Sequence, residues 1–187
     1  MIRGLVFDCD GTLVDTMPLH WMAWRSVCRR HGIKFEEERF YALGGVGSIQ
    51  IFEWLLKEQG LTGDPVELSR EKEESFLPFA PEAKAIEPVM EIVREHRGKL
   101  PMAVATGGKR VNCTAVLKGL GVFDWFDAIV TSEDVENQKP APDVFLQAAE
   151  KIGIPAAECR AYEDTDLGMQ AIHAAGMEAI DIRTLLG

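Results

Sequence analysis

Apolar residues form short continuous runs in some parts of the chain and spaced patterns in others. The runs are typical of buried strands, because a strand that is covered on both faces shows no polar alternation. They predict strands at residues 4–7, 102–105, 128–131, 160–162 and 179–182. The segments before and between the last four runs predict helices at residues 87–96, 111–120, 142–152 and 167–175. Strands that alternate with helices predict an α/β fold with a parallel, doubly wound (Rossmann-like) sheet and right-handed crossovers.

A helical block interrupts this alternation directly after the first strand. From Met17 to about Gly32, tryptophans and other apolar residues recur at helix spacing. Further helices are predicted at residues 36–43, 49–59 and 66–76. The chain is therefore expected to form an α/β core domain from residues 1–15 and 86–187, with residues 16–85 inserted as a small all-helical cap domain.

Size and composition narrow the class of protein. The 187 residues suit one core domain with a modest insert, and the net charge of −10 comes without a basic stripe, so we expect no nucleic-acid partner. No apolar stretch approaches the ~20 residues that span a bilayer, and the N-terminus resembles neither a signal peptide nor an anchor. We expect no membrane partner. The cysteines contain no CxxC pair and are interpreted as reduced, buried thiols of a cytoplasmic protein: Cys9, Cys28, Cys113 and Cys159.

Side chains that could bind a metal ion or take part in catalysis follow the predicted strands. In an open parallel sheet the carboxyl ends of the strands form the ligand-binding edge. In chain order, the residues at that edge are Asp8, Asp10, Thr106, Lys139, Glu163 and Asp164. Clustered carboxylates raise one another's pKa values unless a cation intervenes, and oxygen ligands without histidine or cysteine favour Mg2+. With Lys139 as a second positive charge, the edge of this acidic protein is able to bind a phosphate group.

The motifs at this edge resemble those of a known family. Residues 8–15, DCDGTLVD, resemble the DxDGTLxD signature of the haloacid dehalogenase superfamily. Thr106, Lys139-Pro140 and Glu163-Asp164 fall in the order and context of the other three motifs, so the resemblance covers the whole chain. The helical insert is similar to that of the β-phosphoglucomutase-like branch, and the small fructose-1-phosphate and sugar-phosphate phosphatases of that branch are the most similar group.

The resemblance implies a role for each motif residue. Asp8 attacks phosphorus and forms an aspartyl phosphate, while Asp10 protonates the leaving alkoxide and then activates water. Thr106 and the backbone N–H of Gly107 hold the phosphoryl oxygens, and Lys139 neutralises charge at the phosphate. The implied ligands of Mg2+ are Asp8, the backbone carbonyl of Asp10, Asp164, and Glu163 either directly or through water.

Some of these residues have plainer interpretations that stay open at this point. Thr106 could be a simple helix cap, which is compatible with a phosphate contact. Asp166 is interpreted as a helix-start residue rather than a metal ligand. Cys9, between two catalytic positions, is expected to point the other way and to pack in the core.

The first helix of the predicted cap also carries a family pattern. Residues 15–24, DTMPLHWMAW, resemble the DTxxxHxxAW segment of the branch. His20 and Trp24 are four residues apart and share one helix face. Trp24 is interpreted as cap core. His20 is expected near the active site, where it hydrogen-bonds Asp10 or the substrate.

A cap loop bears on the reaction type. Mutases of this branch carry basic residues there to grip a second phosphate, whereas this chain has Gly44 and Ser48 at those places. Without that grip the phosphoryl group should pass to water, so we expect a hydrolase of a small phosphorylated metabolite, most similar to fructose 1-phosphate. A phosphosugar mutase is the alternative. A dehalogenase is disfavoured by the presence of Asp10, and a phosphate-storing receiver domain by the position of the acidic residues. The sequence leaves the oligomeric state open, and a monomer is the starting expectation.

Overall fold

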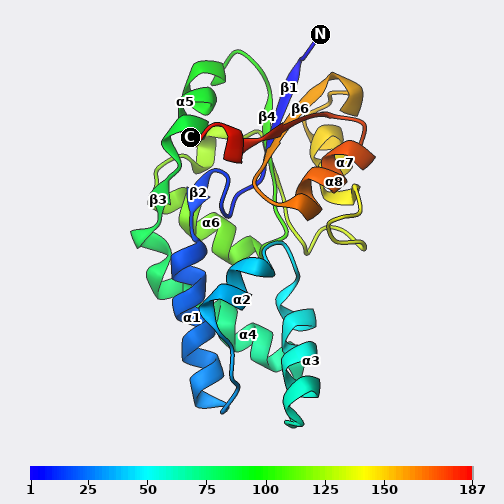
Figure 1. Cartoon of the computed structure of the whole chain (residues 1–187). Coiled ribbons are helices and arrows are strands. Elements are labelled where there is room, and N and C mark those ends of the chain that lie inside the picture. Colours follow the sequence, from blue (N-terminus) through cyan, green and yellow to red (C-terminus); the bar gives the residue numbers. More distant parts are fainter. Residues whose placement is uncertain (187) are drawn as a thin grey trace.

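The core is built on a five-stranded parallel sheet whose order is β5-β4-β1-β6-β7. The computed structural model describes residues 1–186. Its strands are β1 (Gly4–Phe7), β4 (Met102–Ala105), β5 (Ala128–Val130), β6 (Cys159–Glu163) and β7 (Glu178–Asp181). β1 lies in the middle of the sheet, between β4 and β6 (Figure 1). The predicted α/β fold with a parallel sheet is confirmed, and each predicted strand is present to within one residue at either end.

Four helices cover the two faces of this sheet. They are α5 (Glu87–His96), α6 (Arg110–Gly119), α7 (Asp143–Lys151) and α8 (Asp166–Ala174). Successive side chains of a strand point to opposite faces. Accordingly Leu5 and Phe7 of β1 pack in one apolar cluster with α5 and α6, whereas Val6 packs in another with α7 and α8. The sheet is therefore buried on both sides, which explains its continuous apolar runs.

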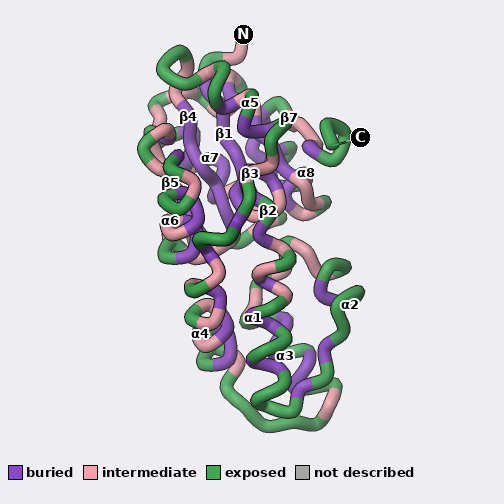
Figure 2. Tube along the Cα trace, turned by 90° about the vertical axis from the view of Figure 1, so that its left-hand side faces the viewer, coloured by how far each residue is buried: buried purple, intermediate pink, exposed green. Residues whose placement is uncertain are grey.

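The helical insert lies beyond the carboxyl edge of the sheet (Figure 1). It consists of α1 (Met17–Arg30), α2 (Glu37–Ala42), α3 (Ser48–Gln59) and α4 (Pro65–Phe76). These helices enclose an apolar cluster of their own, visible as the buried inner side of the insert in Figure 2. Trp24 is 3% exposed and its ring lies 4.3 Å from that of Phe52, so the interpretation of Trp24 as cap core is confirmed.

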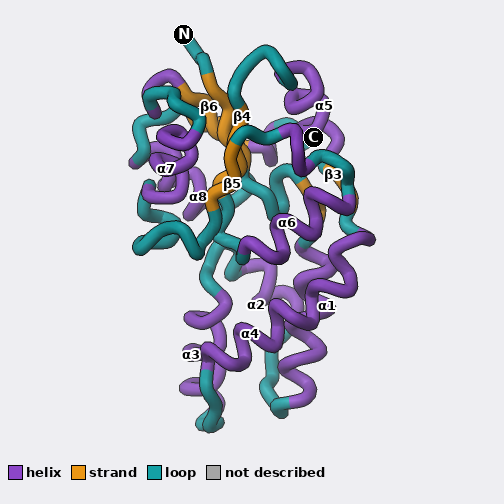
Figure 3. The backbone as a smooth tube through the Cα atoms, turned by 180° about the vertical axis from the view of Figure 1, so that it is seen from behind, coloured by secondary structure: helices purple, strands orange, loops and turns teal. Residues whose placement is uncertain are grey.

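Two short strands join the insert to the core (Figure 3). β2 (Val14–Asp15) pairs antiparallel with β3 (Lys84–Ala85), and the 3-10 helix η1 (Leu77–Glu82) precedes β3. Neither of these two strands is predicted from the sequence. Two-residue strands are too short to produce a period, and their pairing joins residues about seventy positions apart. The proposed domain boundaries lie at this ribbon.

The remaining short elements are the 3-10 helices η2 (Phe123–Trp125), η3 (Ala156–Glu158) and η4 (Ile182–Thr184). None of the helices within residues 1–186 combines the length and the apolar character needed to cross a membrane. All four cysteines are buried and free, as expected.

Candidate functional site

The turn after β1 places two carboxylates at the centre of the carboxyl edge. The carbonyl of Cys9 accepts hydrogen bonds from the N–H groups of residues 12, 13 and 14, which curls the chain back on itself. Gly11 has a φ of +87°, and a Cβ there would lie 2.4 Å from Oδ2 of Asp164, so the turn requires glycine. Cys9 is fully buried in the core cluster. Its predicted packing role is confirmed, and Asp8 and Asp10 are left to face the edge.

Asp8 lies in a buried ion-pair network. Nζ of Lys139 donates hydrogen bonds to Oδ1 of Asp8 at 2.7 Å and to Oε1 of Glu163 at 2.8 Å. All three side chains are at most 7% exposed. Burial raises the pKa of Asp8 well above its usual value, and the attraction of Lys139 only partly opposes this. Burial alone would lower the pKa of Lys139, but Asp8 and Glu163 outweigh it and hold that pKa above its ordinary value.

Glu163 is held from its other side by the start of α8. Its Oε2 accepts hydrogen bonds from the backbone N–H of Thr165 at 2.5 Å and from the Thr165 hydroxyl at 3.0 Å. A Cβ on Gly168 would lie 1.8 Å from Oε1 of Glu163, so only glycine fits beside it. With both oxygens engaged, Glu163 positions Lys139. Asp166 begins α8, as expected, and pairs with Arg183.

Three carboxylates are arranged so that they could share a cation. Asp8, Glu163 and Asp164 each offer an oxygen, and these oxygens lie within 4.8 Å of one another. Asp164 accepts a hydrogen bond from the Thr12 hydroxyl at 2.7 Å. Burial and the neighbouring charge of Glu163 raise the pKa of Asp164 to about 6. A cluster of oxygen ligands that repel one another fits a hard divalent ion such as Mg2+.

The carboxylate of Asp10 turns away from this cluster, toward the helical insert. Its Oδ1 accepts a hydrogen bond from the Thr16 hydroxyl at 2.7 Å and contacts Nε2 of His20 at 3.2 Å. Burial would raise the pKa of Asp10, but His20 and Thr16 prevail and lower it to about 2. The structure thus places His20 beside Asp10, where the sequence predicts it. The predicted metal contact through the backbone carbonyl of Asp10 stays a prediction.

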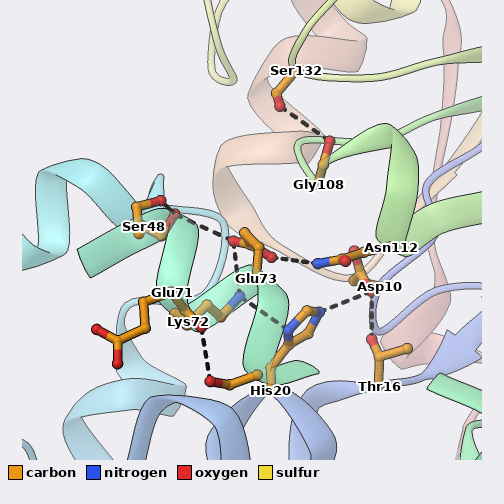
Figure 4. A network of polar contacts seen from close by, with 12 residues as sticks. Asp10, Thr16, His20, Ser48, Glu71, Lys72, Glu73, Gly108, Asn112 and Ser132 are labelled. Atoms are coloured by element: carbon orange, nitrogen blue, oxygen red, sulfur yellow. Dashed lines mark hydrogen bonds and ion pairs between the residues drawn. The ribbon is translucent and has the colours of Figure 1, made fainter. Parts of the chain in front are cut away.

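A lysine that sequence reasoning missed completes this arrangement. Nζ of Lys72, on α4, donates to Nδ1 of His20 at 3.1 Å (Figure 4). The His20 ring stacks on the ring of Phe76, with 4.0 Å between the ring centroids. Because an ammonium group only donates, Nδ1 accepts and Nε2 carries the proton that faces Asp10. Lys72 is 5% exposed. From the sequence, a lysine within a charged helical segment is expected to be exposed to solvent. Only the packing of α4 against α1 brings Lys72 to His20.

The same network continues from the insert into the core. Nζ of Lys72 also donates to Oε1 of Glu73 at 3.1 Å, and the Ser48 hydroxyl donates to that oxygen at 3.4 Å. Nδ2 of Asn112, on α6, donates to Oε2 of Glu73. Glu73 and Asn112 belong to no family motif in the sequence, and residues so far apart in the chain leave no local signal. They connect the two parts of the molecule beside Asp10.

The loop after β4 packs against Asp10 from the core side. Thr106 is 1% exposed, and its hydroxyl accepts a hydrogen bond from the N–H of Gly108 at 2.9 Å. A Cβ on Gly108 would lie 2.9 Å from Oδ2 of Asp10. The residue at the N-cap of α6 is Lys109, so the interpretation of Thr106 as the helix cap is wrong. The loop turns before the helix begins, and Gly107 is exposed within it. Phosphate binding by Thr106 and Gly107 stays a prediction.

The loop between α2 and α3 approaches the start of α8. A Cβ on Gly45 would lie 3.3 Å from the Thr165 hydroxyl oxygen and 3.6 Å from Cβ of Leu167. The loop contains no basic residue. Ser48 stands at one of the places where the resemblance to mutases would require a basic residue. Its hydroxyl lies 2.6 Å from that of Ser69. The insert is therefore closed over the carboxyl edge, and this loop brings no positive charge to it.

Comparison with known proteins places this geometry in context. A family model described as haloacid dehalogenase-like hydrolase matches residues 2–176. Fructose-1-phosphate phosphatase YqaB of Escherichia coli (strain K12) is 38% identical over 182 residues, which is 97% of each chain. Beta-phosphoglucomutase of Bacillus subtilis (strain 168) is 27% identical and covers 97% of this chain and 83% of its own. The crystal structure of beta-phosphoglucomutase from Clostridium difficile, 24% identical, covers 100% of this chain and 88% of its own, with a TM-score of 0.87, and shares the fold.

Proposed function

The chain belongs to the haloacid dehalogenase-like hydrolase family and is a phosphatase of that family, and we propose that it is a Mg2+-dependent phosphomonoesterase of small sugar phosphates. The observation that carries the proposal is that two neighbouring aspartates have different surroundings. Asp8 lies against Lys139 and the acidic cluster, while Asp10, two residues later, is held separately by Thr16 and His20. These separate surroundings support attack on phosphorus by Asp8 and proton transfer by Asp10.

Asp8 is the proposed nucleophile. Its Oδ1 is held by Lys139, which leaves Oδ2 free to attack phosphorus and form an aspartyl phosphate. The positive charge of Lys139 offsets the charge that accumulates as the carboxylate and the phosphoryl group approach. Bound among Asp8, Glu163 and Asp164, Mg2+ would supply the additional positive charge that draws the carboxylate and the phosphate together.

Asp10 is the proposed acid and base. In the arrangement seen here it is held as a carboxylate, with a pKa of about 2, which is the form that accepts a proton from attacking water. To protonate a leaving alkoxide it must first release Thr16 and His20, because these contacts are what lower its pKa. We infer that movement of the insert, which carries His20 and Lys72, couples this release to substrate binding.

The surroundings of Asp10 support transfer to water over transfer to a second sugar hydroxyl. A mutase must hold a bisphosphate, which requires a free cation on the insert. The loop at residues 43–47 has none, and Lys72 is already engaged by His20 and Glu73. The relationship to a fructose-1-phosphate phosphatase at 38% identity supports a compact sugar phosphate as the substrate.

The test is a screen of phosphorylated metabolites for phosphate release with Mg2+. We expect release from hexose monophosphates such as fructose 1-phosphate, little from nucleotides, and loss of activity in chelator that Mg2+ restores. Ca2+ should substitute poorly, because its larger and looser coordination misplaces the in-line attack. Full turnover in excess chelator would contradict the proposal. Labelled phosphate that moved mainly to another sugar hydroxyl would establish the mutase alternative.

A further inference from the structure

Glu73 and Asn112 form a polar contact between the insert and the core that the proposed chemistry does not use. Glu73 is on α4 with its side chain 15% exposed, and Asn112 is on α6 and 4% exposed. Nδ2 of Asn112 donates to Oε2 of Glu73, and Figure 4 shows the two side chains directed toward one another. A chain of hydrogen bonds through Lys72 and His20 connects Glu73 to Asp10.

One atom of this pair lacks a partner. Oδ1 of Asn112 is buried and accepts no hydrogen bond from any residue among 1–186. A buried acceptor without a donor is unfavourable, and one explanation for such an atom is a further group that binds there. Glu73 offers only acceptors, and Asn112 offers one free acceptor and a donor. The pair therefore suits a ligand that brings hydroxyl groups, because a hydroxyl both donates and accepts.

The position of the pair matches the place of a leaving group. A phosphate attacked by Asp8 must present its leaving oxygen to Asp10, since Asp10 supplies the proton. The rest of the substrate then extends from Asp10 toward the insert. On that side His20 contacts Asp10, and Lys72, Glu73 and Asn112 follow His20 in one hydrogen-bonded network.

We propose that Glu73 and Asn112 are specificity-determining residues that bind hydroxyl groups of the sugar. The inference rests on the proposed function and names the part of the substrate that this pair contacts. On binding, the contact between Glu73 and Asn112 opens, a sugar hydroxyl donates to the Glu73 carboxylate, and another donates to Oδ1 of Asn112. The negative charge of Glu73 also disfavours a second phosphoryl group on the sugar, which selects monophosphates.

The decisive variants are Glu73→Gln and Asn112→Ala, with Glu74→Gln as the matched control. Glu74 is the next residue on α4, 58% exposed in its side chain, and pairs with Arg70 at the surface. Each protein is assayed with Mg2+ on fructose 1-phosphate, on fructose 1,6-bisphosphate and on acetyl phosphate, which has no hydroxyl group. Thermal unfolding checks that each variant folds, and Glu73→Gln keeps the shape of the side chain if Asn112→Ala proves unstable.

For both variants we expect kcat/KM on fructose 1-phosphate to fall about tenfold or more relative to kcat/KM on acetyl phosphate, mainly because KM rises. A change of this size corresponds to the loss of one hydrogen bond to a charged or buried group. Glu73→Gln alone should raise activity on the bisphosphate relative to the monophosphate, because Asn112→Ala keeps the charge. The control should match the wild type on all three substrates.

An equal fall on fructose 1-phosphate and acetyl phosphate would overturn the inference and leave the pair as a contact that only closes the insert. Wild-type hydrolysis of acetyl phosphate without hydrolysis of any sugar phosphate would overturn both the inference and the sugar-phosphate substrate class of the proposed function, and would leave only the attack on phosphorus by Asp8. Absence of Mg2+-dependent hydrolysis of acetyl phosphate and of every sugar phosphate would instead refute the proposed function, and the inference with it.

Discussion

Replacing Asp164 by asparagine should stabilise the metal-free protein and remove its response to Mg2+. Asp164 is packed among like charges, and burial together with Glu163 raises its pKa from 3.8 to about 6. Asparagine keeps an oxygen for the hydrogen bond from the Thr12 hydroxyl, which is 2.7 Å long in the structure. The substitution therefore removes a buried charge that destabilises the folded protein, and it changes the packing little.

The sign and size of the effect follow from that pKa. Between pH 3.8 and about pH 6 the folded protein binds more protons at Asp164 than the unfolded chain does, so stability falls as the pH rises through this window. Above about pH 6 the folded protein bears the full free-energy cost of the ionised Asp164 side chain. At about 1.4 kcal/mol per pKa unit, this cost amounts to roughly 3 kcal/mol. The variant should therefore exceed the wild type in free energy of unfolding by up to about 3 kcal/mol at pH 8, and by little at pH 4.

Urea unfolding in chelator between pH 4 and pH 8 measures this difference, and repetition with Mg2+ measures the metal response. Mg2+ should stabilise the wild type and leave the variant nearly unchanged, because a ligand stabilises only the state that binds it. Asp166→Asn is the matched control, since Asp166 is 80% exposed in its side chain and pairs with Arg183. Equal free energies of unfolding for wild type and Asp164→Asn at pH 8 in chelator would refute the reasoning.

Further predictions concern the two aspartates and the contacts of His20. Asp8→Asn should abolish turnover on every substrate while the protein stays folded, as circular dichroism would show; measurable turnover would remove Asp8 from its role. Asp10→Asn should slow hydrolysis of alkyl phosphates roughly a hundredfold, the usual size of general acid–base help, and that of p-nitrophenyl phosphate much less; equal losses on the two would contradict proton donation to the leaving group. Lys72→Met should weaken the hold of His20 on Asp10 and shift the pH dependence of kcat for sugar phosphates; an unchanged pH profile would show that Lys72 acts only in packing.

The sequence alone determined which side chains lie at the carboxyl edge of the sheet. Asp8 and Asp10 follow an apolar run directly, and Glu163 and Asp164 follow another, so local pattern and the geometry of parallel sheets are enough to place them. The spacing of apolar residues predicted the ends of each α-helix to within two residues. The contact of His20 with Asp10 was also predicted, from the resemblance of residues 15–24 to a family segment.

Only the tertiary structure decided how the insert meets that edge. Lys72 reaches His20 across 52 residues of sequence, and Glu73 reaches Asn112 across 39, so no local pattern records either contact. The pairing of β2 with β3 was missed for the same reason, since two residues give no period. Burial also makes Lys72 a partner of His20 and Asp10, because this side chain loses contact with water only when α4 packs against α1. Helices and strands follow from the local sequence, whereas the side-chain network beside Asp10 depends on the packing of distant segments.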